Sequence, residues 1–125
     1  MDKLDLIFAR QRELLERFHQ IEAQHGLLPD PKVPVDITTH QGQAVLRSRA
    51  WNVTEEIAEA MNELKSRPWK QRAYPVDLEA FYEELVDALH FFIELCTLSG
   101  LSAQDLFDRY MGKAAVNTQR QELGV

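Results

Sequence analysis

Two stretches decide the fold: V-T-E-E-I-A-E-A-M-N-E at residues 53–63 and E-E-L-V-D-A-L-H-F at residues 83–91. Apolar residues recur in both at intervals of three or four positions, which predicts amphipathic helices. Each stretch also holds two acidic residues three positions apart: Glu56 with Glu59, and Glu84 with Asp87. This spacing places both carboxylates of a pair on one helix face, one turn apart. Two such helices facing each other would bring four carboxylates together.

Four converging carboxylates repel one another unless a cation lies between them, and ligands that are all oxygen favour a hard ion. Mg²⁺ binds through a few carboxylates completed by water and substrate phosphates, so the four residues predict a magnesium site for a phosphorylated substrate. The alternative is a solvated acidic face, the usual place for acidic residues on helices. Against it, Glu56, Glu59 and Glu63 form a stripe without an interleaved Lys or Arg, whereas surface helices usually mix signs.

A transition-metal site is a second alternative, because Glu84, Asp87 and His90 form E-x-x-D-x-x-H, loosely like the Glu-x-x-His ligands of di-iron bundles. Only one such His is present and the other acidic helix has none, so a magnesium site is preferred. His90 is then expected beside the site, where it hydrogen-bonds within the bundle. We also expect Glu63 and Lys70 to lie around the metal ligands and to support them without being among the four principal ligands.

The remaining sequence predicts helices separated by connections that contain proline. We expect helices over residues 4–26, 42–66 and 77–99 and a fourth from residue 102 onward. Asp77 is a predicted N-cap, and Ser102 with Asp105 resembles a capping box. Strand signals are absent, and no linker divides the chain. The sequence therefore predicts one domain over residues 1–125, an all-α four-helix bundle.

Composition narrows the classes of partner. The chain has 125 residues, 45% of them hydrophobic, a formal net charge of -6 and one cysteine. A pI near 5.2 argues against binding to nucleic-acid polymers or anionic membranes, which require clustered Lys and Arg. Cys96 has no intramolecular disulfide partner, and no apolar run approaches the ~20 residues of a membrane span. We expect a cytoplasmic protein that does not associate with membranes.

A polar face is predicted near the C-terminus. If the last helix continues through residues 113–120, Lys113, Asn117 and Arg120 share one face. An ammonium, an amide and a guanidinium in line can bind a polyphosphate and a sugar hydroxyl. The alternative is an ordinary basic surface near a helix C-terminus.

Two further residues are candidates for contact with a nucleobase. Gln11 occupies a core position of the first predicted helix, and a buried amide requires hydrogen-bond partners that a base edge can supply. A polar residue that fixes helix register is the alternative for Gln11. Trp69 follows Pro68 in the connection after the first acidic stretch and can stack on a base, or else cover one end of the core.

These features resemble the all-α nucleoside triphosphate pyrophosphohydrolases, the superfamily of MazG-like enzymes and dimeric dUTPases, whose signature is E-x-x-E on one helix and E-x-x-D on the next. The resemblance is closest to the dimeric dUTPase and phage dCTP/dUTP pyrophosphatase branch. Three motifs carry it: E-I-A-E-A-M-N-E at residues 56–63, V-D-A-L-H-F at residues 86–91, and K-x-x-x-N-x-x-R-Q-x-x-G at residues 113–124. The N-terminal I-F-A-R-Q-R-E-L at residues 7–14 is similar to the branch's first helix, whose glutamine tends to face the base.

The resemblance implies Mg²⁺-dependent hydrolysis of a deoxynucleoside triphosphate, with dUTP or dCTP expected, to the monophosphate and pyrophosphate. Glu56 or Glu59 would act on the attacking water. There are two alternatives. The chain could carry out the same chemistry on a purine or modified nucleotide, or it could be a non-catalytic helical regulator. Wide apolar faces on the first and third predicted helices favour a homodimer or homotetramer in which a neighbouring subunit helps to line the base pocket.

Overall fold

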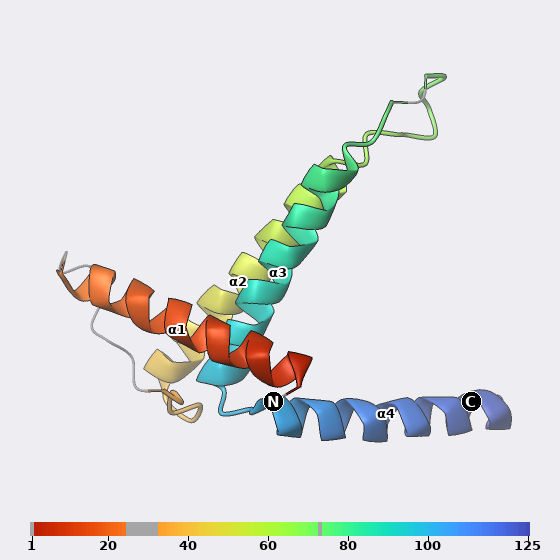
Figure 1. Cartoon of the computed structure of the whole chain (residues 1–125). Helices are drawn as coiled ribbons and strands as arrows, with labels where there is room; N and C mark the ends of the chain where they lie inside the picture. The colour runs from red at the N-terminus through yellow and green to blue at the C-terminus, as the bar shows by residue number, and fades with distance from the viewer. Residues whose placement is uncertain (1, 25–32, 73) are drawn as a thin grey trace.

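Four α-helices make up the computed structural model of the chain, which describes residues 2–24, 33–72 and 74–125 and contains no strand within them (Figure 1). The helices are α1 (Lys3–Gln24), α2 (His40–Asn62), α3 (Leu78–Leu98) and α4 (Ala103–Leu123). The predicted all-α fold is therefore confirmed.

Side chains close to the helix starts explain where the helices begin. Thr39 Oγ1 accepts a hydrogen bond of 3.0 Å from the Gly42 amide at the start of α2. The Asp77 carboxylate accepts one of 3.1 Å from the Ala80 amide at the start of α3. Ser102 and Asp105 bond each other's amides at the start of α4, which confirms the predicted capping box. Each cap satisfies amides that have no partner within the helix, and is worth about 1 kcal/mol.

The end of α2 differs from the predicted one. The apolar pattern predicts helix to residue 66, whereas α2 ends at Asn62. The amides of Glu63 and Leu64 bond the carbonyls three residues back instead of four, so the α-helical pattern stops there. Pro68 also disfavours helical backbone at Arg67. The Arg67 guanidinium donates to the Leu64 carbonyl at 2.8 Å and to the Ser66 carbonyl at 2.9 Å. The predicted end of the first helix near Gly26 lies outside the described residues.

Helices α2 and α3 form the centre of the fold as an antiparallel pair, and α1 crosses α3 near the lower end of that pair in Figure 1. Each helix of the pair contributes a small residue to the core: Ala60 on α2 and Ala88 on α3 are both buried. The largest fully buried side chains are those of Leu15, Ile93 and Leu98, where α1 meets α3. The core is therefore concentrated at the crossing of α1 with the pair.

Helix α4 leaves the other three helices. Gly100, with φ of 88°, allows a sharp turn after α3, and the axes of α3 and α4 differ by 104°. Among the described residues α4 contacts α1 and no other helix, and it extends alone to the C-terminus in Figure 1. No single described helix has the length and apolarity of a membrane span; α3 and α4 reach that threshold only when taken together across their bend.

We predict that Gly42→Ala destabilises the protein by about 1–3 kcal/mol, because a Cβ at this position would collide with the backbone carbonyl of Asp36. Gly112→Ala in α4 is the matched control, because no atom lies within 4 Å of its Cβ position. Removing a glycine from a helix interior stabilises it by about 0.5–1 kcal/mol. Urea unfolding of both variants measures the difference, and equal midpoints would contradict the prediction.

Candidate metal centre

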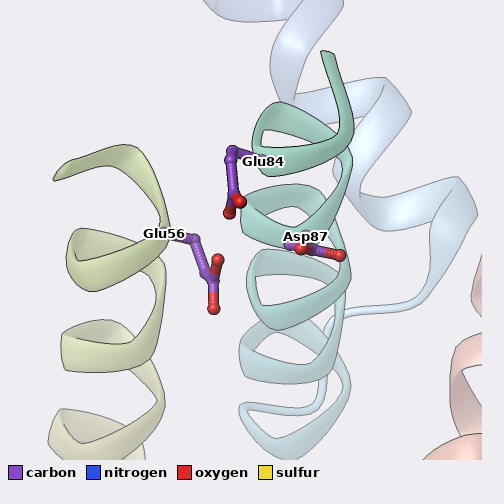
Figure 2. Close-up of side chains that lie close together, drawn as sticks. All are labelled: Glu56, Glu84 and Asp87. Carbon is purple, nitrogen blue, oxygen red and sulfur yellow. The ribbon is translucent and has the colours of Figure 1, made fainter. Parts of the chain in front are cut away.

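Three of the four predicted carboxylates converge between α2 and α3. Glu56 from α2 and Glu84 from α3 point toward each other, and Asp87 projects from α3 one turn along (Figure 2). One carboxylate oxygen from each lies within 4.8 Å of the other two. The three residues are partly buried, so water screens their charges less than at an open surface.

Glu59 belongs to the same cluster through its effect on Glu84. A hydrogen bond with the Glu59 carboxyl is the largest of the effects that raise the pKa of Glu84 to about 7, followed by burial and by a hydrogen bond with Glu56. Burial is the main cause that raises the pKa of Glu56, and the charges of Glu59 and Asp87 add to it. All four carboxyls therefore interact, and a pKa of about 7 leaves Glu84 about half protonated at neutral pH.

The donor set fits a magnesium ion. Glu56 Oε2 and Glu84 Oε2 are buried, and no described donor outside the carboxyl cluster bonds them, which is costly for a carboxylate unless a ligand takes the place of that donor. Oxygens on opposite sides of a Mg²⁺ ion are about 4.2 Å apart, so a cluster within 4.8 Å needs only small side-chain rotations to share one ion. The carboxylate oxygens select a hard ion over a soft one.

Gln11 of α1 contacts α3 about one turn beyond Asp87. Its side chain is buried, and its Oε1 lies 2.6 Å from Nδ1 of His90, which is three residues after Asp87 on α3. An amide oxygen only accepts hydrogen bonds, so Nδ1 carries the proton and Nε2 of a neutral His90 is left as an acceptor. The structure thus brings Gln11 and His90 together at one flank of the carboxylates.

The residues in and near the α2–α3 connection are arranged more loosely. Glu63 caps the C-terminus of α2, one turn beyond Glu59. Trp69 is 76% exposed, and the Lys70 ammonium lies 5.3 Å from the centre of the Tyr74 ring. No described contact joins Trp69 to the carboxylates, and the connection that carries Trp69 extends beyond the ends of α2 and α3 in Figure 1.

Lys113, Asn117 and Arg120 all lie on α4 and are exposed. Because α4 contacts neither α2 nor α3 among the described residues, one copy of the chain does not bring this face to the carboxylates. The three residues keep the shared helix face that their spacing predicts. Within one chain, the structure assembles the candidate metal ligands with Gln11 and His90, and leaves the α4 residues apart.

A buried ion pair in the α2–α3 interface is absent from the sequence-based prediction. Arg49 Nε donates to Glu94 Oε1 at 2.7 Å, and the two side chains are only 16% and 4% exposed. One signal was available in the sequence: Arg49 and Glu94 each stand seven residues from a predicted ligand, on the same helix face. Which residue each of them contacts across the interface depends on how the two helices pack, and spacing within one helix does not give that.

Carboxylates E-x-x-E and E-x-x-D opposed across two antiparallel helices match the signature of the all-α nucleoside triphosphate pyrophosphohydrolases. A family model described as dUTPase matches residues 3–97, so the chain belongs to the dimeric dUTPase family. The match includes all four carboxylates, Gln11 and Trp69, and ends before α4. Neither the curated proteins nor the solved structures contain a significant match. Membership of this family supports nucleotide pyrophosphohydrolase activity in general.

We predict that the metal-free protein loses stability as the pH rises from about 5 to 7.5. The folded state keeps a proton on Glu84, whose pKa is raised to about 7, whereas the unfolded chain releases it near 4.5. The folded state therefore binds more protons in this window, and its stability falls with rising pH. Melting temperatures in EDTA across the range measure the effect.

Glu84→Gln should flatten this dependence and melt higher than the wild type at pH 8, because it removes one of the repelling charges. Glu83→Gln, a change at an exposed neighbour on α3, is the control and should keep the wild-type slope. A wild-type melting temperature that rises steadily from pH 5 to 7.5 would contradict the prediction.

Proposed function

We propose that the chain hydrolyses a deoxynucleoside triphosphate, dUTP and/or dCTP, to the monophosphate and pyrophosphate with Mg²⁺. The observation that carries the proposal is the convergence of Glu56, Glu84 and Asp87, with two buried carboxylate oxygens that no described donor outside the cluster bonds. Membership of the dUTPase family supports it. The proposed activity would control the level of its nucleotide in the pool.

Glu56, Glu59, Glu84 and Asp87 would hold the ion. When bound, Mg²⁺ neutralises charge on the phosphates and lowers the pKa of a coordinated water. Glu56 or Glu59 would accept the proton of the attacking water, since both carboxyls lie in the cluster and the pKa of Glu56 is already raised by burial. Glu63, one turn beyond Glu59, would orient the water or a ligand.

The buried Gln11 and its partner His90 would meet the nucleotide at the flank of the site, with Gln11 directed at the base. The polar edge of a base offers donors and acceptors that match an amide, and a site built to bond them rejects bases that lack them. Trp69 would stack on the base from the α2–α3 connection, with Lys70 beside the phosphates. These assignments place base choice outside the metal ligands.

Lys113, Asn117 and Arg120 would complete the site from a second copy of the chain, with the cationic residues on the phosphates and Asn117 on the sugar. Only Ala103, the first residue of α4, is buried on this helix. Five larger apolar residues on α4 are each at least 41% exposed: Phe107, Tyr110, Met111, Val116 and Leu123. Helices in proteins gain most of their stability from packing of an apolar face, so α4 would be stabilised by a partner surface, which a homodimer or homotetramer would supply.

Pyrophosphate release from dUTP, dCTP, dTTP, dATP and dGTP tests the proposal. We expect Mg²⁺-dependent turnover of dUTP or dCTP, abolished by EDTA. Turnover confined to purine nucleotides would show that the substrate carries a different base and that the proposed reaction is unchanged. A folded protein that turns over none of them would contradict the proposal and favour a non-catalytic regulator.

Glu59→Gln and Asp87→Asn should each lower kcat by about 10²-fold or more, because each removes a group that acts on the water or the ion. Both should also remove the rise in melting temperature on adding Mg²⁺. Glu79→Gln, an exposed residue in the first turn of α3, serves as the control and should keep both properties.

Mixing two inactive variants tests whether α4 acts on a neighbouring site. Glu59→Gln lacks a carboxylate and Arg120→Ala lacks the phosphate contact. If each site combines residues of two copies, refolding the variants together yields dimers that contain one intact site, with about a quarter of the wild-type activity. Recovery of no activity from a confirmed mixed oligomer would place the α4 residues at the site of their own copy or outside any site.

A further inference from the structure

The buried ion pair between Arg49 and Glu94 shares a stripe with the metal ligands. Arg49 lies seven residues before Glu56 on α2, and Glu94 lies seven residues after Asp87 on α3. Seven residues are about two helical turns, so each partner of the ion pair occupies the same helix face as its ligand, roughly 10 Å away. Because the two helices are antiparallel, equal steps in opposite chain directions keep the pairs opposite each other. The alignment that joins Arg49 to Glu94 also opposes Glu56 to Asp87.

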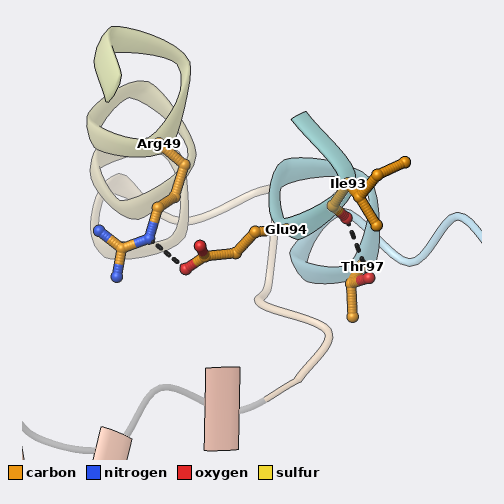
Figure 3. Close-up of polar contacts among 4 residues, drawn as sticks. All are labelled: Arg49, Ile93, Glu94 and Thr97. Carbon is orange, nitrogen blue, oxygen red and sulfur yellow. Dashed lines mark hydrogen bonds and ion pairs between the residues drawn. The ribbon is translucent and has the colours of Figure 1, made fainter. Parts of the chain in front are cut away.

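The geometry of the ion pair favours one alignment of α2 and α3. Arg49 Nε lies 2.7 Å from Glu94 Oε1, and the pair crosses the interface between the helices (Figure 3). Breaking a buried pair leaves an uncompensated charge, which makes any misaligned packing unfavourable. A slip of α2 by one turn would move its residues by about 5.4 Å and separate the two charges.

The other interactions at this interface are less directional. Ala60 on α2 and Ala88 on α3 are buried, and burial of apolar surface stabilises the packing without a directional requirement. Among the described residues Arg49–Glu94 is the one ion pair that joins α2 to α3.

We infer that Arg49 and Glu94 are positioning residues that fix the register of α2 against α3 and thereby set the affinity of the carboxylate cluster for Mg²⁺. The inference rests on the proposed magnesium site. It gives Arg49, a cation two turns from the site, a role that favours Mg²⁺ binding. The charge of Arg49 alone would oppose binding.

Two simpler roles make different predictions. If the pair acted only through its charges, removing the positive charge of Arg49 would strengthen Mg²⁺ binding, because a cation repels a cation. If the pair only stabilised the fold, its loss would lower the melting temperature and leave the Mg²⁺ affinity of the folded protein unchanged. A register role requires that Arg49→Met and Glu94→Gln both weaken Mg²⁺ binding.

Calorimetric titration of the full-length protein with Mg²⁺ alone, well below the melting temperature, separates these roles. We expect Arg49→Met and Glu94→Gln each to weaken binding about 10-fold, in the range seen when residues that orient metal ligands are lost. The charge-swapped variant R49E/E94R should recover most of the affinity. The control is Glu16→Gln, which removes a carboxylate from the exposed Arg12–Glu16 pair on α1 and should bind as the wild type does. Tighter or unchanged binding by Arg49→Met would overturn the inference.

A distance measurement tests register without metal. Spin labels at residues 55 and 83, exposed positions on α2 and α3, report the alignment in a Cys96→Ala background diluted with unlabelled protein. Loss of the ion pair should broaden the distance distribution or shift it by up to about 5 Å, one helical turn, and R49E/E94R should restore it. A distribution unchanged by Arg49→Met would overturn the register role. If the wild type binds no Mg²⁺, the proposed function fails, and the distances still decide whether the pair sets register.

Discussion

The close antiparallel packing of α2 on α3 is the constraint on which the rest of the structure depends. It places carboxylates from both helices within 4.8 Å of one another and partly out of water. Like charges at such a distance oppose the packing that creates them. Burial disfavours the charged forms as well: a hydrogen bond with Glu59 and burial raise the pKa of Glu84, and burial raises the pKa of Glu56. The apolar contacts around α1 and the buried Arg49–Glu94 pair act in the other direction. Stability is thus given up at the site and recovered elsewhere in the same helices, as is common for functional sites.

Local features of the fold were predictable from the sequence because their causes are local. The apolar spacing of the helices and the caps at Asp77 and Ser102 each depend on residues within one or two turns. The early end of α2 was missed because the amides of Glu63 and Leu64 bond carbonyls three residues back, a change that apolar periodicity does not reveal. The direction of α4 was not predictable, since one glycine at φ of 88° sets it and many helix arrangements satisfy the same pattern.

The candidate site likewise combines features that local sequence predicts with features that depend on tertiary packing. The spacing of the four acidic residues predicts which carboxylates share a helix face, and their opposition in the structure follows once α2 and α3 are antiparallel neighbours. The contact between Gln11 and His90, 79 residues apart, and the Arg49–Glu94 pair, 45 residues apart, depend on tertiary packing. No local pattern selects these partners, because spacing within one helix does not tell which residues of another helix face it.

The structure also separates the parts of the proposed reaction among parts of the chain with different constraints. The carboxylates occupy the most tightly packed pair of helices, where a shift of one turn would disperse them. The α4 face lies on a helix that touches only α1 in one copy, so its position relative to any site depends on what covers its exposed apolar residues. An enzyme arranged in this way can change its grip on phosphate and sugar by changing subunit contacts while α2 and α3 stay as they are. Under the proposed function, association between copies would then control activity directly, because the candidate metal ligands come together within one chain and the proposed phosphate-binding face of α4 does not lie beside them.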